Sequence, residues 1–209
     1  MKGAAPERAD AGGDGARLRA QRADAARNRE RVLAAARRLF AERGLRNVSM
    51  ADVARDAGVA KGTVFHRFGD RAGLALALLD EHERDLQERV LRGPPPLGPG
   101  APARERLRAF LAALAELTDE QRELLLEVDH ARPAGRYRTG AYAAWAAHTA
   151  LLLHELRPEA DAALLADIIL APLSADLVEH LRASRSLDEL CGALLDAADR
   201  LIAPHRPGL

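Results

Sequence analysis

The sequence predicts an all-α protein, and three observations favour that class. Val, Ile and Thr, which strands prefer, number only 8, 3 and 4 among the 209 residues. Ala and Leu, which are strong helix formers, dominate the chain. Apolar residues also recur at helical spacing between short segments rich in glycine or proline.

The length of 209 residues allows one domain, or two small ones, with a substantial core. The single cysteine, Cys191, excludes an internal disulfide and suits a reducing cytosol. No stretch approaches the ~20 apolar residues of a membrane span, and the first 30 residues lack the apolar region of a secretory signal. We therefore expect a soluble, cytoplasmic protein with no membrane partner.

The net charge of zero conceals an asymmetry along the chain. Residues 1–71 contain 16 Lys and Arg against 9 Asp and Glu, whereas residues 72–209 contain 15 against 22. A basic N-terminal third favours a polyanionic partner. On charge alone, chance clustering of surface residues stays open as the alternative.

Residues 1–24 contain almost no large apolar side chains. They cannot offset the entropy of ordering by burial, so we expect a disordered basic arm. The arm either reaches a groove of a nucleic-acid partner or stays solvated, and both interpretations remain open.

The first helix is expected over residues 25–43, where one apolar stripe runs, with Gly44 as its terminator. Ser49 then begins a second helix as its N-cap, in a near capping box with Asp52. Gly58 supplies the positive φ that a sharp turn between helices requires. A short helix follows over about 61–68.

A longer helix is expected over about 71–91, before the proline-rich segment 93–102 interrupts the helical pattern. Further helices are predicted at 103–117, 119–131, 138–156, 159–184 and 187–203. Pro172 should kink the one at 159–184.

Residues 49–68 thus read as helix, glycine turn and helix, a unit that places its second helix in the DNA major groove. Val64 and Phe68 lie four residues apart and can anchor the short helix on the core. The remaining positions then face outward: Lys61, Gly62, Thr63, His66 and Arg67. Lys and Arg neutralise phosphates, and Thr and Arg can contact base edges. The alternative is a helix-turn-helix shape used only for packing.

Residues 32–79 resemble the N-terminal domain of tetracycline-repressor-type (TetR/AcrR) regulators. The resemblance rests on Phe40, Gly44, the Ser-capped second helix, the motif AGVAKGTVF and the aromatic residue before a capping Asp. It implies a three-helix DNA-binding domain over 25–70 and a helical ligand-binding and dimerisation domain over 71–209. It also implies a homodimeric, ligand-responsive transcriptional regulator, more a repressor than an activator, that binds a palindromic operator in double-stranded DNA.

By match, the family's DNA contacts fall on Ser49, Lys61, Gly62, Thr63, Phe65, His66, Arg67 and Arg71. The sequence departs from the family at three positions. Ala60 replaces a Ser or Thr cap, Phe65 replaces a common Tyr, and Gly73 replaces an acidic residue. These departures leave a second class open, a helical adaptor that binds another protein and has lost DNA affinity.

In the family an inducer pocket lies among the middle helices. The candidates in this chain are His82, His130, Tyr137, Tyr142, Trp145 and His148. The scarcity of charge in 141–153 favours a small, mostly apolar effector. Ordinary core packing of these side chains is the alternative.

The last two predicted helices carry apolar stripes wider than an isolated amphipathic helix needs. The family suggests that these stripes form a dimer interface, while burial within one monomer is the alternative. The candidate residues are Leu177, Leu181, Leu187, Leu190, Leu194 and Leu201.

The sequence does not favour an enzyme. Glu127 and His130 have the i, i+3 spacing of di-iron carboxylate bundles, but no second such pair exists. Cys191 lies on an apolar stripe, as a buried inert thiol would. No serine lies in a glycine elbow and no glycine-rich phosphate loop follows a strand, so we expect no catalysis, cofactor or metal.

Overall fold

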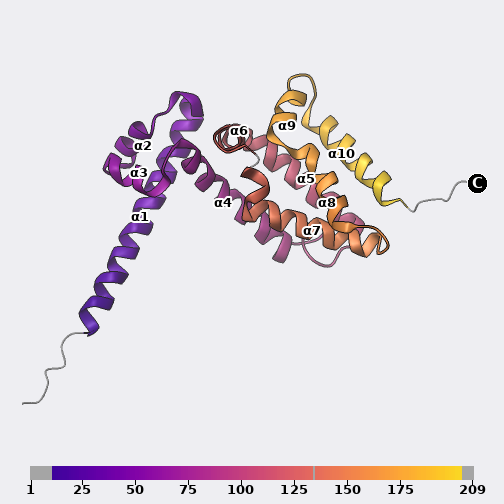
Figure 1. The fold of residues 1–209 in the computed structure, drawn as a ribbon, viewed down its shortest axis with the longest axis horizontal. Coiled ribbons are helices and arrows are strands. Elements are labelled where there is room, and N and C mark those ends of the chain that lie inside the picture. The colour runs from indigo at the N-terminus through magenta and orange to yellow at the C-terminus, as the bar shows by residue number, and fades with distance from the viewer. Residues whose placement is uncertain (1–10, 134, 204–209) are drawn as a thin grey trace, which may run out of the picture. The chain divides into compact units, whose positions relative to one another are not determined.

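The computed structural model describes residues 11–133 and 135–203, and within these ranges it contains helices and no strand, which confirms the all-α class (Figure 1). The α-helices are α1 (Ala11–Arg43), α2 (Met50–Ala57), α3 (Lys61–Phe68), α4 (Arg71–Arg92), α5 (Ala103–Glu120), α6 (Arg122–Ala131), α7 (Gly140–Leu156), α8 (Ala162–Leu170), α9 (Ala175–Arg182) and α10 (Leu187–Ile202). Three short 3-10 turns are η1 (Leu45–Asn47), η2 (Gly135–Arg138) and η3 (Ala171–Leu173). None of the helices described is both long enough and apolar enough to span a bilayer.

The helices fall into two compact units, divided between Asp70 and Arg71. The N-terminal unit contains α1, α2 and α3, and the C-terminal unit contains α4 to α10.

The N-terminal unit has its own core, which forms where α1 packs on α2 and α2 on α3. Its buried side chains include Val32, Leu33, Leu39, Leu45, Val48, Val53, Val64 and Phe68. An ion pair between Arg38 of α1 and Asp56 of α2 joins two helices at the edge of this core. Helix α3 is therefore fixed to a packed scaffold through one face.

Helix α1 begins at Ala11, well before the start predicted at residue 25. The expected disorder is therefore wrong for residues 11–24, which are helical, while residues 1–10 lie outside the described residues. The physical reason is that Ala and Arg have high helix propensity. Once the packed half of α1 has formed, adding further turns requires no new nucleus and no burial.

A left-handed glycine makes the turn between α2 and α3. Gly58 has φ 62° and ψ 39°, and its N–H donates to carbonyl oxygens of the last turn of α2. Arg31 of α1 donates from Nη2 to the carbonyl oxygen of Gly58 at 3.1 Å. The turn is thus held both by its own backbone and by the neighbouring helix.

Replacing Gly58 with alanine should destabilise the N-terminal unit by about 1–2 kcal/mol, because an L side chain in the left-handed region is strained. Its Cβ would also lie 2.6 Å from the Arg31 guanidinium. Gly62→Ala is the matched control, since no heavy atom lies within 4 Å of its Cβ. In the control, alanine should add roughly 0.5–1 kcal/mol of helix stability. Urea denaturation measures both, and equal midpoints would contradict the assigned role of Gly58.

The C-terminal unit is built around α5, which packs against α7, α9 and α10, while α4 packs along α6 and α7 along α8. The centre of its core is formed by Leu107, Phe110, Leu111, Leu152, Leu153 and Leu170. All of these side chains are nearly or completely inaccessible to solvent.

The helix predicted over 159–184 is wrong as a single element, because the structure divides it into α8, η3 and α9. Pro172 stands in the 3-10 turn η3, and Ser174 follows in an extended conformation as the N-cap of α9. Proline has no backbone N–H to donate to a helical hydrogen bond. The helix therefore ends near Pro172 and the chain turns there, whereas the sequence predicted a kink in one continuous helix.

Candidate nucleic-acid interface and ligand cavity

Helix α3 has one buried face and one exposed face. Val64 is 0% exposed and Phe68 is 9% exposed, and both belong to the core. The exposed face of α3 consists of Lys61, Gly62, Thr63, Phe65, His66 and Arg67. Two apolar anchors four residues apart therefore hold the helix so that all its polar side chains meet solvent.

Lys61 and Phe65 interact on the exposed face of α3. The Lys61 Nζ lies 5.5 Å from the centroid of the Phe65 ring, and the ring is 42% exposed. A cation over an aromatic face is attracted by the ring quadrupole, so the pair orders one turn of the helix. Ala60, at the N-cap of α3, provides no side-chain hydrogen bond.

Ser49 caps α2 in a complete capping box. Its Oγ donates to Asp52 Oδ2 at 2.5 Å and accepts from the Asp52 N–H at 3.1 Å. These hydrogen bonds lower the pKa of Asp52, the side-chain bond with Ser49 being the largest cause and the bond from the Ser49 backbone N–H the next. Ser49 is exposed, but its hydroxyl is engaged in the cap.

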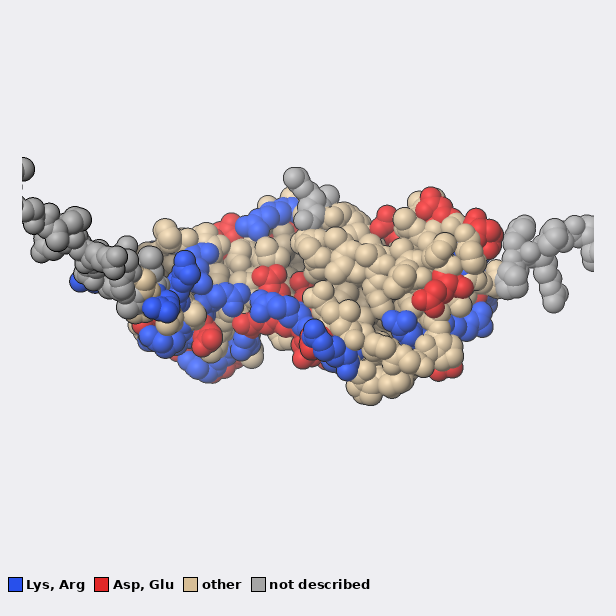
Figure 2. Space-filling model, turned by 90° about the horizontal axis from the view of Figure 1, so that it is seen from below, with Lys and Arg blue, Asp and Glu red and all other residues tan. Residues whose placement is uncertain are grey.

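A hollow of about 520 Å³ lies between the middle of α1 and α3. Gln21, Asp24 and Asn28 line one side, and His66 and Arg67 line the other. The sequence did not predict this feature, because the predicted first helix began only at residue 25. On the face that Figure 2 shows, Lys and Arg gather over the N-terminal unit.

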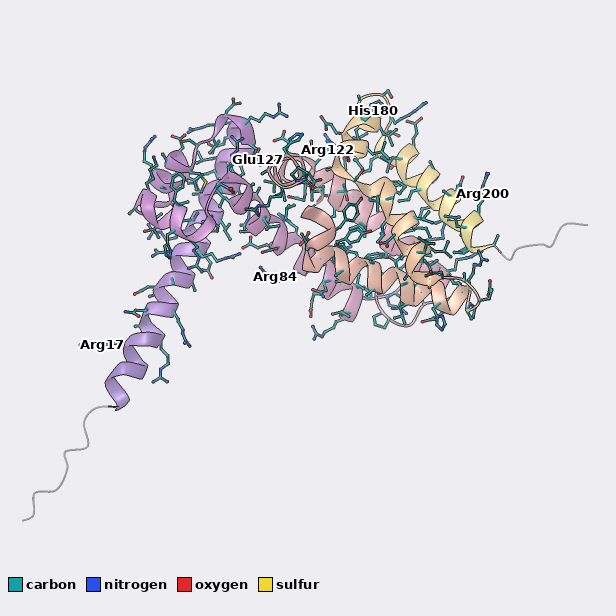
Figure 3. The ribbon with its side chains drawn as sticks, in the orientation of Figure 1. Arg17, Arg84, Arg122, Glu127, His180 and Arg200 are labelled. Atoms are coloured by element: carbon teal, nitrogen blue, oxygen red, sulfur yellow. The ribbon has the colours of Figure 1, made fainter. Side chains whose placement is uncertain are left out.

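Arg71, which resemblance placed among the DNA contacts, is engaged within the C-terminal unit. Its Nε and Nη2 bind the two carboxylate oxygens of Glu127 at 2.8 and 3.0 Å. Glu127 belongs to α6 (Figure 3), so this bidentate, partly buried pair joins the start of α4 to α6. The structure therefore gives Arg71 a role in holding two helices together.

A largely apolar cavity of about 90 Å³ lies within the C-terminal unit. Its aliphatic lining includes Leu76, Leu79, Leu114, Leu125, Val128 and Leu173. Tyr142 and Trp145 from α7 line it as well, and so do two carboxylates, Glu83 of α4 and Asp129 of α6. The Tyr142 hydroxyl donates to Asp167 Oδ1 at 2.7 Å, which fixes the orientation of its ring.

Of the predicted ligand-binding residues, the structure brings Tyr142 and Trp145 to this cavity and leaves the others elsewhere. His130 and Tyr137 are exposed, although the Tyr137 ring contacts Tyr142 edge to face at 5.0 Å. His82 lies by the carbonyl oxygen of Leu78, one turn earlier in α4.

His148 also lies outside the cavity lining and packs edge to face on Phe110 at 4.9 Å. Burial lowers its pKa, with a smaller contribution from the positive charge of Arg106. His148 is thus a half-buried histidine whose ring packs on the core residue Phe110.

Glu83 is the cavity residue that sequence reasoning missed. Burial, together with the nearby negative charge of Asp80, raises its pKa to about 7. A signal was present, because Glu83 continues the apolar stripe of Leu76 and Leu79 at i, i+3 and i+7. A carboxylate at a core-facing position is unusual enough to mark a site.

Two of the residues predicted to form a dimer interface lie in the chain's own core. Leu190 and Leu194 belong to the central cluster of the C-terminal unit and are nearly buried. This expectation is therefore corrected, because the stripe of α10 faces α5. Leu181, Leu187 and Leu201 are half-buried, and Leu177 is exposed.

A short helix held by two apolar anchors, preceded by a glycine turn and bearing an exposed cationic face, has the geometry of a helix-turn-helix unit. Comparison with known proteins narrows this assignment for one segment of the chain. Residues 32–78 match the sequence profile of the bacterial regulatory proteins of the tetR family, so this segment is similar to the N-terminal domain of those regulators.

Curated relatives are similar over a third to a half of the chain. The regulator AcrR of Shigella flexneri is 31% identical over 107 residues, 50% of this chain and 49% of AcrR. The regulator SAB2452 of Staphylococcus aureus is 37% identical over 65 residues, 31% of this chain and 34% of that protein. The matched segments thus cover about half, or a third, of these relatives.

Solved structures resemble the chain over most of its length. A TetR-family regulator from Pectobacterium atrosepticum has a TM-score of 0.64 and 23% identity, covering 86% of this chain and 94% of its own. A regulator from Saccharomonospora viridis, crystallised with choline, has a TM-score of 0.60 and 25% identity, covering 82% and 95%. The helical C-terminal unit therefore has the fold of known regulators.

Proposed function

We propose that this protein is a cytoplasmic, ligand-responsive transcriptional repressor that binds a palindromic operator as a homodimer. A small, mostly apolar effector in the cavity of the C-terminal unit releases it. The observation that carries this proposal is the exposure of every polar side chain of α3, within a segment that matches the tetR family profile.

The proposed contacts with DNA divide by chemistry. Lys61 and Arg67 neutralise phosphates and displace counterions. Thr63 and His66 reach base edges, and the absence of a side chain at Gly62 lets the backbone approach the duplex. We retain Phe65 as a neighbour that orders Lys61, and we retain Ser49 chiefly as a helix cap.

The effector acts through α4. This helix contributes Leu76, Leu79 and Glu83 to the cavity, and it begins at Arg71, directly after the loop that ends α3. Different placements of α4 would set different distances between the two α3 helices of the dimer. A ligand that binds one placement more tightly than the other shifts the population toward the corresponding distance. Relief of repression then requires only that the favoured spacing mismatch the operator.

Dimerisation is supported by exposed apolar side chains on the last helices. Leu164 is 57% exposed and Ile168 is 48% exposed on α8, and Leu177 follows on α9. The half-buried Leu181, Leu187 and Leu201 extend this apolar surface to α10. A two-fold pairing of such a surface would present two α3 helices to half-sites about one DNA turn, ~34–36 Å, apart.

A gel shift on the intergenic DNA upstream of the protein's own gene tests the proposal. We expect a site-specific complex whose affinity falls steeply between 50 and 200 mM salt, roughly 10³-fold or more for six or more phosphate contacts. Scrambled DNA of the same composition is the control. Equal binding to both DNAs, or none to either, would instead favour the adaptor that Ala60 and Phe65 left open.

A further inference from the structure

We propose that the cavity of the C-terminal unit takes an amphiphilic organic cation, whose ammonium group pairs with the Glu83 carboxylate while its apolar body packs among the leucines. This inference rests on the proposed function only in treating the cavity as the effector site. It adds the chemical class of the effector, which sequence reasoning gave only as mostly apolar.

The first support is the charge of the lining. Two carboxylates, Glu83 and Asp129, face a wall that is otherwise apolar or uncharged, and no Lys or Arg is among the described residues that line it. A carboxylate ligand would be repelled here. A cation, in contrast, would gain attraction strengthened by the low local dielectric.

The second support is the state of Glu83. Within the described residues the half-buried Glu83 carboxylate makes no hydrogen bond or ion pair, and burial together with the negative charge of Asp80 raises its pKa to about 7. Burying a carboxylate without a partner is unfavourable. A bound cation would supply the missing partner, so binding and ionisation of Glu83 should be coupled.

The third support is the aromatic wall. Trp145, nearly buried, and Tyr142 line the same cavity as Glu83. An indole face is the aromatic surface that best attracts an ammonium group.

A neighbouring hollow shares Glu83 and Trp145, and its wall also includes Asp80 and Arg84 of α4. Figure 3 labels Arg84 on this helix, and Arg84 is not among the residues that line the first cavity.

The lining of the cavity defines the rest of the ligand. Most of the side chains that line it are aliphatic, as is usual in small-molecule sites. A bare inorganic or methylammonium ion would leave the leucine surfaces unfilled. The proposed ligand is therefore a lipophilic amine or quaternary ammonium compound.

Three probes that have a similar phenylalkyl chain but different head groups test the inference. They are 4-phenylbutyltrimethylammonium, 4-phenylbutanol and 4-phenylbutyrate. Trp145 is the only tryptophan of the chain, so its fluorescence reports binding without DNA. At pH 8 we expect the cation to bind at least tenfold more tightly than the alcohol, and the anion most weakly. An alcohol that equals the cation, or an anion that binds best, would overturn the assignment.

Glu83→Gln is expected to remove this preference, lowering cation affinity about tenfold or more with little change for the alcohol. Glu88→Gln is the matched control, because Glu88 lies on the same helix and pairs at the surface with Arg92. An unchanged ratio of cation to alcohol affinity in Glu83→Gln would contradict the pairing. The wild-type probe series decides the question independently should this variant fold poorly.

The pH dependence supplies a further readout. Since the pKa of Glu83 is raised to about 7, its carboxylate gains a proton between pH 8 and pH 6. Cation affinity should fall about tenfold over this range while alcohol affinity stays constant. The charged groups near Glu83 are Asp80 and Arg84 on α4 and Asp129 across the cavity.

The proposed regulator function and the proposed class of effector can be contradicted separately. Cation binding without any change in operator affinity would leave this inference standing and remove the release mechanism. Operator binding with no preference among the three probes would remove this inference and leave the regulator.

Discussion

The double variant Lys61→Ala/Arg67→Ala should lose roughly 100-fold or more in operator affinity at moderate salt, at about 1.4 kcal/mol or more per contact. Both side chains lie on the exposed face of α3 and carry no core packing. The loss should be similar for specific and scrambled DNA, because phosphate contacts carry no sequence information. The plot of log affinity against log salt concentration should flatten by about one unit for each phosphate contact removed.

Arg71→Ala is the control for this experiment. Its guanidinium binds Glu127 on α6, so its loss should lower the stability of the C-terminal unit and leave the salt dependence unchanged. A flattened slope in Arg71→Ala would restore it to the DNA contacts. An unchanged slope in the double variant would rule out a phosphate role for Lys61 and Arg67.

The second large effect concerns Phe68. Replacing this buried ring with alanine should destabilise the N-terminal unit by about 3–5 kcal/mol, the usual cost of deleting a core phenyl group. A unit of this size has a stability of roughly the same magnitude. We therefore expect loss of DNA binding together with unfolding of α1 to α3, while the C-terminal unit, whose core uses none of these helices, stays folded.

Hydrogen exchange measured on peptides from each unit checks this result. Protection should disappear from residues 30–70 and persist across α5 and α7. Phe65→Ala is the matched control, because this ring, three residues earlier, is exposed and its loss should cost little stability. Equal loss of protection in both units would show that they do not unfold separately.

Much of the N-terminal unit was predictable because its determinants are local. Ser49 and Asp52 form the expected capping box, and Gly58 takes the expected left-handed conformation. Val64 and Phe68 are the expected anchors. Each of these assignments depends on residues within one or two turns of one another, which periodicity and capping patterns read directly.

The cavity was less predictable because its walls come from elements far apart in the sequence. Trp145 and Tyr142 were found through the clustering of aromatic residues. Glu83 was missed because the sequence does not show its spatial neighbours, and without them it resembles an ordinary surface carboxylate. His148 was assigned to the wrong environment for the same reason, since its contact with Phe110 on α5 is not a local feature.

The sequence by itself determined the helical class, the recognition unit and the residues α3 exposes, because helix periodicity, caps and glycine turns act over a few residues. Only the tertiary structure decided that Arg71 pairs with Glu127, that Leu190 and Leu194 face the core, and that Glu83 lines a cavity with Trp145. These outcomes depend on which helix faces cover one another. Burial and the pairing of charges across distant segments settle that choice.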